Sequence, residues 1–434
     1  MSRYNGLSIS LYSALANGIK LLAGPLTILF ISKNLNSEEI GFYYTFFSLV
    51  AMQQLAELGL GHTLRQYIAH SYKIHDNQWT EESKKKIKSY INFGFKWFSA
   101  VALFMIIIVA PAGLLYYSDY NGSIYWLAPW LMLASVTALV TIATPVQILL
   151  EATQNQKQVY QAQSVAALLN SLTIWTLISH GAGLYTIPCS LIVSNIALYM
   201  MLSSNAISYY KALRDTEISA KASSVFKELW PLLSRVSIVW GVGFLFWNGF
   251  NLISFKIYDA DYAGKVIFTI TLARAGFGLA ESFFSSQITV ISYNISQGHI
   301  QQAKQYARKY QLTSISMLVI GYIIFLWLGY MWPDFFIVQK TVDLKYSISI
   351  FAFFVSTLLL ITENNFIRCF KAEPFVLVSI FQGVMVPLSF YLANKFSIKL
   401  YLYPCILIII ISIIASRTIA RRFLANRSFI SVGN

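Results

Sequence analysis

Charged residues are scarce in this chain of 434 residues: only 12% are charged, whereas 56% are hydrophobic and the mean hydropathy is +0.58. Soluble domains carry about twice that share of charge, so the composition excludes a soluble protein. The chain also lacks the ten-residue alternation of polar and apolar residues that is typical of membrane β-barrel strands. It is therefore predicted to be an all-α protein that crosses a membrane many times.

Cysteine and histidine are few and dispersed. The three cysteines, Cys189, Cys369 and Cys405, lie in or beside apolar segments without the spacing of a metal site or a disulfide framework. The five histidines stand mostly in predicted loops, and no paired carboxylates accompany them in an outer loop. We therefore expect no metal, no cofactor and no enzymatic activity.

Apolar segments long enough to cross a hydrocarbon core of about 30 Å recur from end to end. Trp126 and Trp130 open the fourth of them, and we expect both rings at the outer membrane interface. Twelve spans fit, with approximate bounds 7–31, 39–61, 91–115, 125–150, 163–179, 184–203, 229–258, 262–292, 310–332, 346–370, 374–393 and 400–415.

The net charge of +14 would suit a nucleic-acid-binding protein, but the placement of the charges argues against that class. With twelve spans, most Lys and Arg residues fall on one side of the membrane, as in Lys84–Lys86 and Arg417–Arg427. Cytoplasmic loops of membrane proteins carry this excess. We therefore expect both termini in the cytoplasm and no nucleic-acid partner.

The two halves of the chain share a pattern. Gly41 precedes Glu57 in the second span much as Gly264 precedes Glu281 in the eighth. Six spans return each half to the cytoplasm, which predicts two six-helix bundles related by a pseudo-twofold axis along the membrane normal. The predicted parts are a first bundle over residues 1–204, a cytoplasmic linker over 205–228, a second bundle over 229–416 and a basic cytoplasmic tail over 417–434.

Two cations interrupt apolar segments at mid-depth. Lys20 lies in the first span on a polar stripe with Asn17 and Thr27, and Arg274 lies in the eighth. A charge at this depth costs at least about 2.5 kcal/mol, so we expect both to face a wet cavity between the bundles. The alternative for Lys20 is a buried pair with an acidic residue that serves helix packing only.

A cationic cavity favours an anionic substrate. Arg presents paired donors to phosphate oxygens and Lys adds a point charge, so Lys20 and Arg274, with Asn17 beside them, are predicted to bind a group such as a pyrophosphate. Three acidic residues in other spans are predicted to balance these charges or to carry protons in a coupled cycle: Glu57, Glu281 and Glu363.

The twelve-span layout, the polar first span and the stretch Glu57-Leu58-Gly59-Leu60-Gly61 resemble the multidrug/oligosaccharidyl-lipid/polysaccharide exporter superfamily. Within it, the chain is most similar to bacterial O-antigen and polysaccharide flippases. The resemblance implies alternating-access translocation of undecaprenyl-pyrophosphate-linked oligosaccharide from the cytoplasmic to the periplasmic leaflet of the inner membrane. It also implies contacts with membrane lipids and with the polymerase and chain-length proteins of polysaccharide assembly.

Two other functions stay open. A drug/cation antiporter of the same superfamily would share the architecture, but cationic substrates need an acidic cavity, which Lys20 and Arg274 argue against. A membrane O-antigen polymerase or glycosyltransferase would have a similar composition. Its chemistry needs a large outer loop with acid–base residues, and the predicted outer loops are short.

Overall fold

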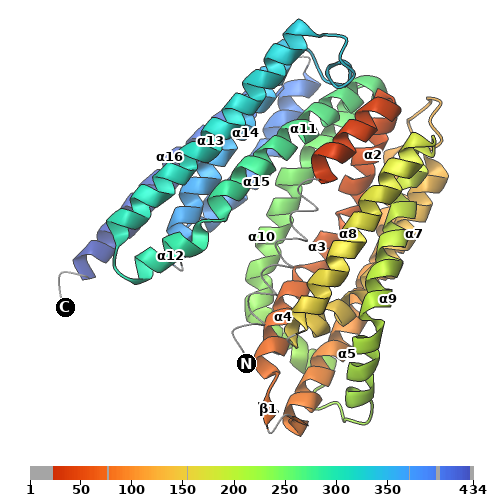
Figure 1. The fold of residues 1–434 in the computed structure, drawn as a ribbon, viewed down its shortest axis with the longest axis vertical. Coiled ribbons are helices and arrows are strands. Elements are labelled where there is room, and N and C mark those ends of the chain that lie inside the picture. Colours follow the sequence, from red (N-terminus) through yellow and green to blue (C-terminus); the bar gives the residue numbers. More distant parts are fainter. Residues whose placement is uncertain (1–22, 76–77, 154, 371, 397–400, 431–434) are drawn as a thin grey trace. The chain divides into compact units, whose positions relative to one another are not determined.

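The computed structural model describes residues 23–75, 78–153, 155–370, 372–396 and 401–430, and this part of the chain is almost entirely helical (Figure 1). A helix over residues 23–34 comes first. A short antiparallel hairpin of two-residue strands, β1 (Ile74–His75) and β2 (Gln78–Trp79), lies between helices in the chain. The remaining elements are α2 (Ser37–Val50), α3 (Gln53–Glu57), α4 (Leu60–Ser71), α5 (Glu81–Phe104), η1 (Met105–Val109), α6 (Ala110–Tyr116), α7 (Leu127–Ala152), α8 (Gln156–Ser179), η2 (Gly183–Tyr185), α9 (Thr186–Arg214), α10 (Ala222–Ile257), α11 (Ala260–Ser285), α12 (Ile288–Ser296), α13 (Ile300–Met331), η3 (Val338–Lys340), α14 (Leu344–Arg368), α15 (Val376–Lys395) and α16 (Tyr403–Ile430).

Within the described residues, 10 helices are long and apolar enough to cross a membrane, and they match the third to twelfth predicted spans. The chain is thus a multi-pass membrane protein of the predicted all-α class. The first predicted span falls largely outside the described residues. The second is interrupted, because α2 ends at Val50 and the short α3 follows it.

Contacts within the chain divide it into two units: residues 1–35 with 45–244, and residues 36–44 with 245–434. The division between residues 244 and 245 falls inside α10, which is a single helix from Ala222 to Ile257. The segment predicted as a polar linker, 205–228, is also mostly helical, because α9 continues to Arg214 and α10 begins at Ala222. Likewise α16 continues through the predicted basic tail to Ile430.

Local sequence accounts for where key helices begin. The Thr80 side chain accepts a hydrogen bond from the Ser83 backbone N–H, and Glu81 and Glu82 fill the first turn of α5. At the start of α11, Asp259 accepts a hydrogen bond from the backbone N–H of Tyr262 at 3.0 Å. Such caps satisfy backbone donors that have no partner inside the helix, and acidic groups there complement the helix dipole.

Trp130 does not form part of an exposed aromatic belt, because its side chain is completely buried in the first unit. A π-helix, Met105–Val109, precedes Pro111 in the neighbouring segment, and the Trp130 indole donates to the Ala110 carbonyl oxygen at 2.9 Å. Gly113 makes room for the ring, since a Cβ there would lie 2.2 Å from it. The irregular turn and the missing side chain together form the indole's site.

In the second unit, the start of α2 crosses α11 at two glycines that hold matching places in the two halves of the sequence. A Cβ on Gly264 would lie 1.7 Å from the Ser37 carbonyl oxygen, and one on Gly41 would lie 3.3 Å from the Gly264 Cα. The backbones therefore touch directly. Beside this crossing the Phe42 and Phe255 rings meet edge to face, with centroids 4.8 Å apart.

Candidate functional site

Lys20 and Asn17 lie outside the described residues, so their predicted roles stay predictions. Thr27, from the same polar stripe, is described in the first unit. Its hydroxyl oxygen accepts a hydrogen bond from the Trp175 indole of α8 at 3.0 Å, and Phe30 stacks on the same indole with ring centroids 5.5 Å apart. The described end of the first helix is therefore held against α8 by one polar and one aromatic contact.

Arg274 lies on α11 in the second unit, and its contacts with the described residues use only one of its N–H donors. One guanidinium nitrogen, Nη1, donates to the Trp247 backbone carbonyl of α10 at 3.2 Å. The guanidinium carbon lies 4.6 Å from the centre of the Trp247 ring, a cation–π contact. Among the described residues, Arg274 forms no ion pair. A guanidinium has five N–H donors in a fixed fork, so this one can still bind an anionic group.

Glu281 follows Arg274 on the same helix, seven residues and thus about 10 Å further along. Its carboxylate accepts a hydrogen bond from the Ser285 hydroxyl. Gly278 lies between the two charges, and a Cβ added there would meet no described atom within 4 Å. Among the described residues, this face of α11 is therefore uncovered at Gly278, with a cation at one end and an anion at the other.

Glu57 ends α3 at a break in the first unit rather than lying within a continuous helix. Leu58 and Gly59 both have left-handed backbone angles, with φ 56° and φ 73°, and α4 begins at Leu60. A Cβ on Gly61 would come within 2.9 Å of the Glu57 Oε1, so the carboxylate lies against the first turn of α4. The free N–H groups and positive dipole end at a helix start favour a carboxylate at this place.

This break gives the Glu-Leu-Gly-Leu-Gly stretch a structural reason. The Leu58 carbonyl oxygen accepts a hydrogen bond from the Ser237 hydroxyl of α10 at 3.1 Å. A Cβ on Gly59 would lie 2.4 Å from a methyl carbon of Val236 on the same helix. Glycine is thus needed at position 59 twice, for its backbone conformation and for the close approach of α10.

A charged cluster that the sequence analysis did not single out lies on α4, α7 and α8. Arg65 Nε lies 2.7 Å from Oε2 of Glu151, and the other oxygen of Glu151 accepts hydrogen bonds from the amides of Gln147 at 2.9 Å and Gln163 at 3.3 Å. The Glu151 side chain is only 10% exposed, whereas that of Arg65 is 47% exposed. Gln147, one helical turn before an acid at the end of an apolar segment, was the signal available in the sequence.

Glu363 also has a dedicated partner. Arg417 of α16 holds its two carboxylate oxygens with Nη2–Oε1 at 2.7 Å and Nε–Oε2 at 2.9 Å, a two-point contact within the second unit. The sequence had placed Arg417 in a basic tail, apart from the membrane helices. Of the acids predicted to have coupling or charge-balancing roles, Glu363 is the one with an arginine on both oxygens.

This chain resembles known proteins in its fold rather than in its sequence. No family model and no curated protein sequence matches the chain. Among solved structures, the chain is similar to the inward-facing conformation of a multidrug resistance MATE family transporter of the MOP superfamily, with TM-score 0.65, 12% identity, and 94% of this chain and 98% of that chain covered. The MATE multidrug transporter DinF-BH in complex with R6G gives TM-score 0.55 and 14% identity, with 97% and 96% covered.

A third similar structure is a MOP superfamily transporter from Pyrococcus furiosus, in which the reverse polarity of the binding pocket suggests a different function. It gives TM-score 0.50 and 12% identity, with 98% of this chain and 95% of that chain covered. Identities this low establish the fold and nothing finer. The fold of this chain is that of MATE transporters of the MOP superfamily, and the predicted fold class is confirmed.

Proposed function

We propose that this protein is a flippase of the bacterial inner membrane, with both termini in the cytoplasm. It moves an undecaprenyl-pyrophosphate-linked oligosaccharide from the cytoplasmic to the periplasmic leaflet by alternating access. The single observation that carries the proposal is Arg274, a guanidinium on an apolar helix without an ion-pair partner among the described residues. Keeping such a charge in a membrane helix is costly unless water or an anionic ligand meets it.

The chemistry of Arg274 suits a pyrophosphate. The Trp247 contacts fix the guanidinium plane and leave N–H groups that bond to no carboxylate and no side chain of the described residues. Paired N–H donors match two oxygens of one phosphate group, and a desolvated site strengthens that match. Lys20 is proposed to add a second positive charge and Asn17 an amide donor. The Pyrococcus furiosus transporter with reversed pocket polarity supports the idea that this fold accommodates substrates of different charge.

The carboxylates fit this proposal in different ways. Glu363 is neutralised by Arg417, and Glu57 lies against the first turn of α4, so both are proposed to balance charge within the protein. Glu281 shares an open face with Arg274 and has a hydroxyl as its partner. It is therefore the acid that we propose to accept a proton, or to neutralise Arg274, when the substrate has left. Membrane lipids and the polymerase and chain-length proteins are the proposed partners.

A drug/cation antiporter is the second candidate, because Glu281 provides a carboxylate without a basic partner among the described residues. The multidrug transporters with similar folds favour this function as well. The two candidates predict opposite consequences of removing each charge. For an anionic substrate, loss of Arg274 lowers transport strongly. For a cationic drug, loss of Glu281 abolishes it.

The test measures surface polysaccharide in a flippase-deleted strain that carries each variant, together with the amount of protein in the membrane. Arg274→Ala should lower export by about tenfold or more, since a charged hydrogen bond is worth about 1.5–3 kcal/mol. Arg274→Lys should be intermediate because it keeps the charge but not the fork. Arg417→Lys is the matched control: it also loses a two-point contact, but with Glu363 and not with the proposed substrate, so export per amount of membrane protein should stay near normal.

Resistance to cationic drugs is measured in the same strains. Normal protein with lost polysaccharide and unchanged drug resistance supports the flippase. Drug resistance that depends on Glu281, with polysaccharide unaffected by Arg274→Ala, would establish the antiporter instead. If polysaccharide falls only in step with the protein level, and Glu281→Gln restores the level in the Arg274→Ala variant, these two charges act on structure alone.

A further inference from the structure

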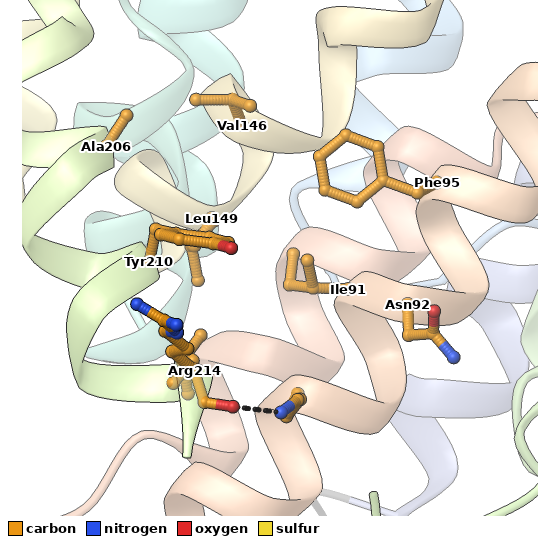
Figure 2. Close-up of a pocket in the computed structure, with 10 residues that line it drawn as sticks. Ile91, Asn92, Phe95, Val146, Leu149, Ala206, Tyr210 and Arg214 are labelled. Carbon is orange, nitrogen blue, oxygen red and sulfur yellow. Dashed lines mark hydrogen bonds between the residues drawn. The ribbon is translucent and has the colours of Figure 1, made fainter. Parts of the chain in front are cut away.

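The first unit contains a cavity of about 360 Å³ between α5, α7 and α9 that is separate from every residue considered above (Figure 2). Its volume falls at the lower end of the range of about 300–1,000 Å³ that small-molecule sites occupy. Figure 2 shows the labelled residues of α5 and those of α9 on opposite sides of the cavity, and Val146 and Leu149 come from α7. The lining residues are Lys88, Ile91, Asn92, Phe95, Val146, Leu149, Ala206, Tyr210, Leu213 and Arg214.

The lining changes from apolar to basic along the length of the cavity. Figure 2 shows Phe95, Val146 and Ala206 at one end and Arg214 at the other. Lys88 precedes Phe95 by seven residues on α5, so the two are separated by about 10 Å along the helix. An amphiphile with an acyl chain and an anionic head has the same sequence of properties over that length.

The basic end is fixed in place. The Lys88 ammonium donates to the carbonyl oxygens of Arg214 at 2.8 Å and Thr216 at 2.5 Å, at the end of α9 (Figure 2 draws the first bond). Its third N–H has no partner in the part of the chain that the structure describes. The Arg214 side chain is exposed and forms no ion pair with any residue in the described part of the chain.

Two of the three acids close to this end in the chain are engaged with other bases, and the third, Asp215, directly follows Arg214. Glu217 lies 3.8 Å from Lys85, and Glu228 lies 3.6 Å from Lys86 and accepts a hydrogen bond from the Tyr90 hydroxyl at 2.7 Å. Lys88 and Arg214 outnumber the single remaining carboxylate of Asp215, so this end of the cavity presents net positive charge. The excess of basic residues lies on this side of the proposed topology, so this end faces the cytoplasm, where the leaflet surface carries anionic lipids.

We infer that this cavity binds an anionic glycerophospholipid of the cytoplasmic leaflet. The start of one acyl chain lies against Ile91, Val146 and Leu149, and the phosphate is bound by Arg214 and Lys88. The exposed Tyr210 ring covers the region between head and chain, where aromatic residues with a polar tip are favoured. This site is independent of the proposed transport substrate, because none of its residues takes part in that proposal.

The test is native mass spectrometry of the purified full-length protein titrated with phosphatidylglycerol or with zwitterionic phosphatidylcholine. Wild type should retain phosphatidylglycerol more tightly, and Arg214→Gln should reduce that preference about tenfold. Lys211→Gln removes an exposed cation of the same helix that does not line the cavity, and should change little. An equal loss in the two variants would mean general surface charge rather than a site, and would overturn the inference.

A second pair of variants tests the apolar end. Ala206→Phe fills the cavity and should weaken retention of both lipids, whereas Ala212→Phe, on an exposed position of α9 outside the lining, should not. Ala206→Leu serves if the larger side chain prevents folding. If inorganic phosphate displaces phosphatidylglycerol at millimolar concentration, or if Ala206→Leu and Ala206→Phe leave lipid retention unchanged, the acyl chain is not bound here and the inference fails.

Discussion

The contact between α2 and α11 predicts that Gly264→Ala separates two helices in the second unit. A Cβ at this position would lie 1.7 Å from the Ser37 carbonyl oxygen, whereas real Cβ atoms essentially never approach closer than 3.0 Å. Relief therefore requires a shift of about 1.3 Å (3.0 minus 1.7). Both atoms belong to backbone or are fixed to it, so no rotamer change can supply that movement.

The expected cost combines two opposing effects. Overpacking a close contact costs about 1–3 kcal/mol and sometimes more, and a gap of 0.5–1 Å already forfeits about a quarter to a half of the dispersion energy between the separated surfaces. The higher helix propensity of alanine stabilises the folded state by at most about 1 kcal/mol. We therefore expect Gly264→Ala to lower the free energy of unfolding by about 2 kcal/mol or more. The Phe42–Phe255 contact beside the crossing should be lost with it.

Gly278 provides the matched control, because it lies in the same helix and a Cβ there would meet no described atom within 4 Å. Gly278→Ala should leave the free energy of unfolding unchanged or raise it by up to about 1 kcal/mol. The measurement is reversible unfolding of the purified protein in mixed micelles, with an increasing fraction of a denaturing detergent. Equal stabilities for the two variants would refute the direct backbone contact.

Three further results are expected. Gly59→Ala should lower the free energy of unfolding by about 2–3 kcal/mol in the same assay, because it adds a clash with α10 to the strain of a left-handed backbone. Gly181→Ala, at a left-handed position with no described atom within 4 Å, should lower it by only about 1–2 kcal/mol, and equal effects would exclude the clash. Arg65→Gln should lower the free energy of unfolding more than Glu151→Gln, because it leaves the more buried charge unpaired. The double variant should recover part of that loss, and no recovery would mean that the two residues do not act as a pair. A reporter fused after Asp215, between α9 and α10, should give a cytoplasmic signal, and a periplasmic one would invert the proposed topology.

The membrane helices were predictable because their signal is local. Length and hydropathy of one segment suffice to predict a span, and the ten spans that the described residues contain follow the predicted order. The burial of Trp130 was not predictable in that way. Tryptophan near the end of a span usually indicates the membrane interface. Trp130 is buried instead because Gly113, in another segment, leaves room for its ring and the Ala110 carbonyl accepts its N–H.

Which charges meet was less predictable still, and the Glu57 region shows why. Steps of four place Glu57 and Arg65 on one face only if a single helix carries both. Leu58 and Gly59 end one helix and start another, so the spacing no longer fixes the relative directions of the two side chains. Arg65 instead meets Glu151, a partner 86 positions away that no periodicity connects with it. The two left-handed residues change the direction of the chain between α3 and α4. A change that made this segment one continuous helix should therefore break the Arg65–Glu151 ion pair and, at the same time, remove Glu57 from its position at a helix start.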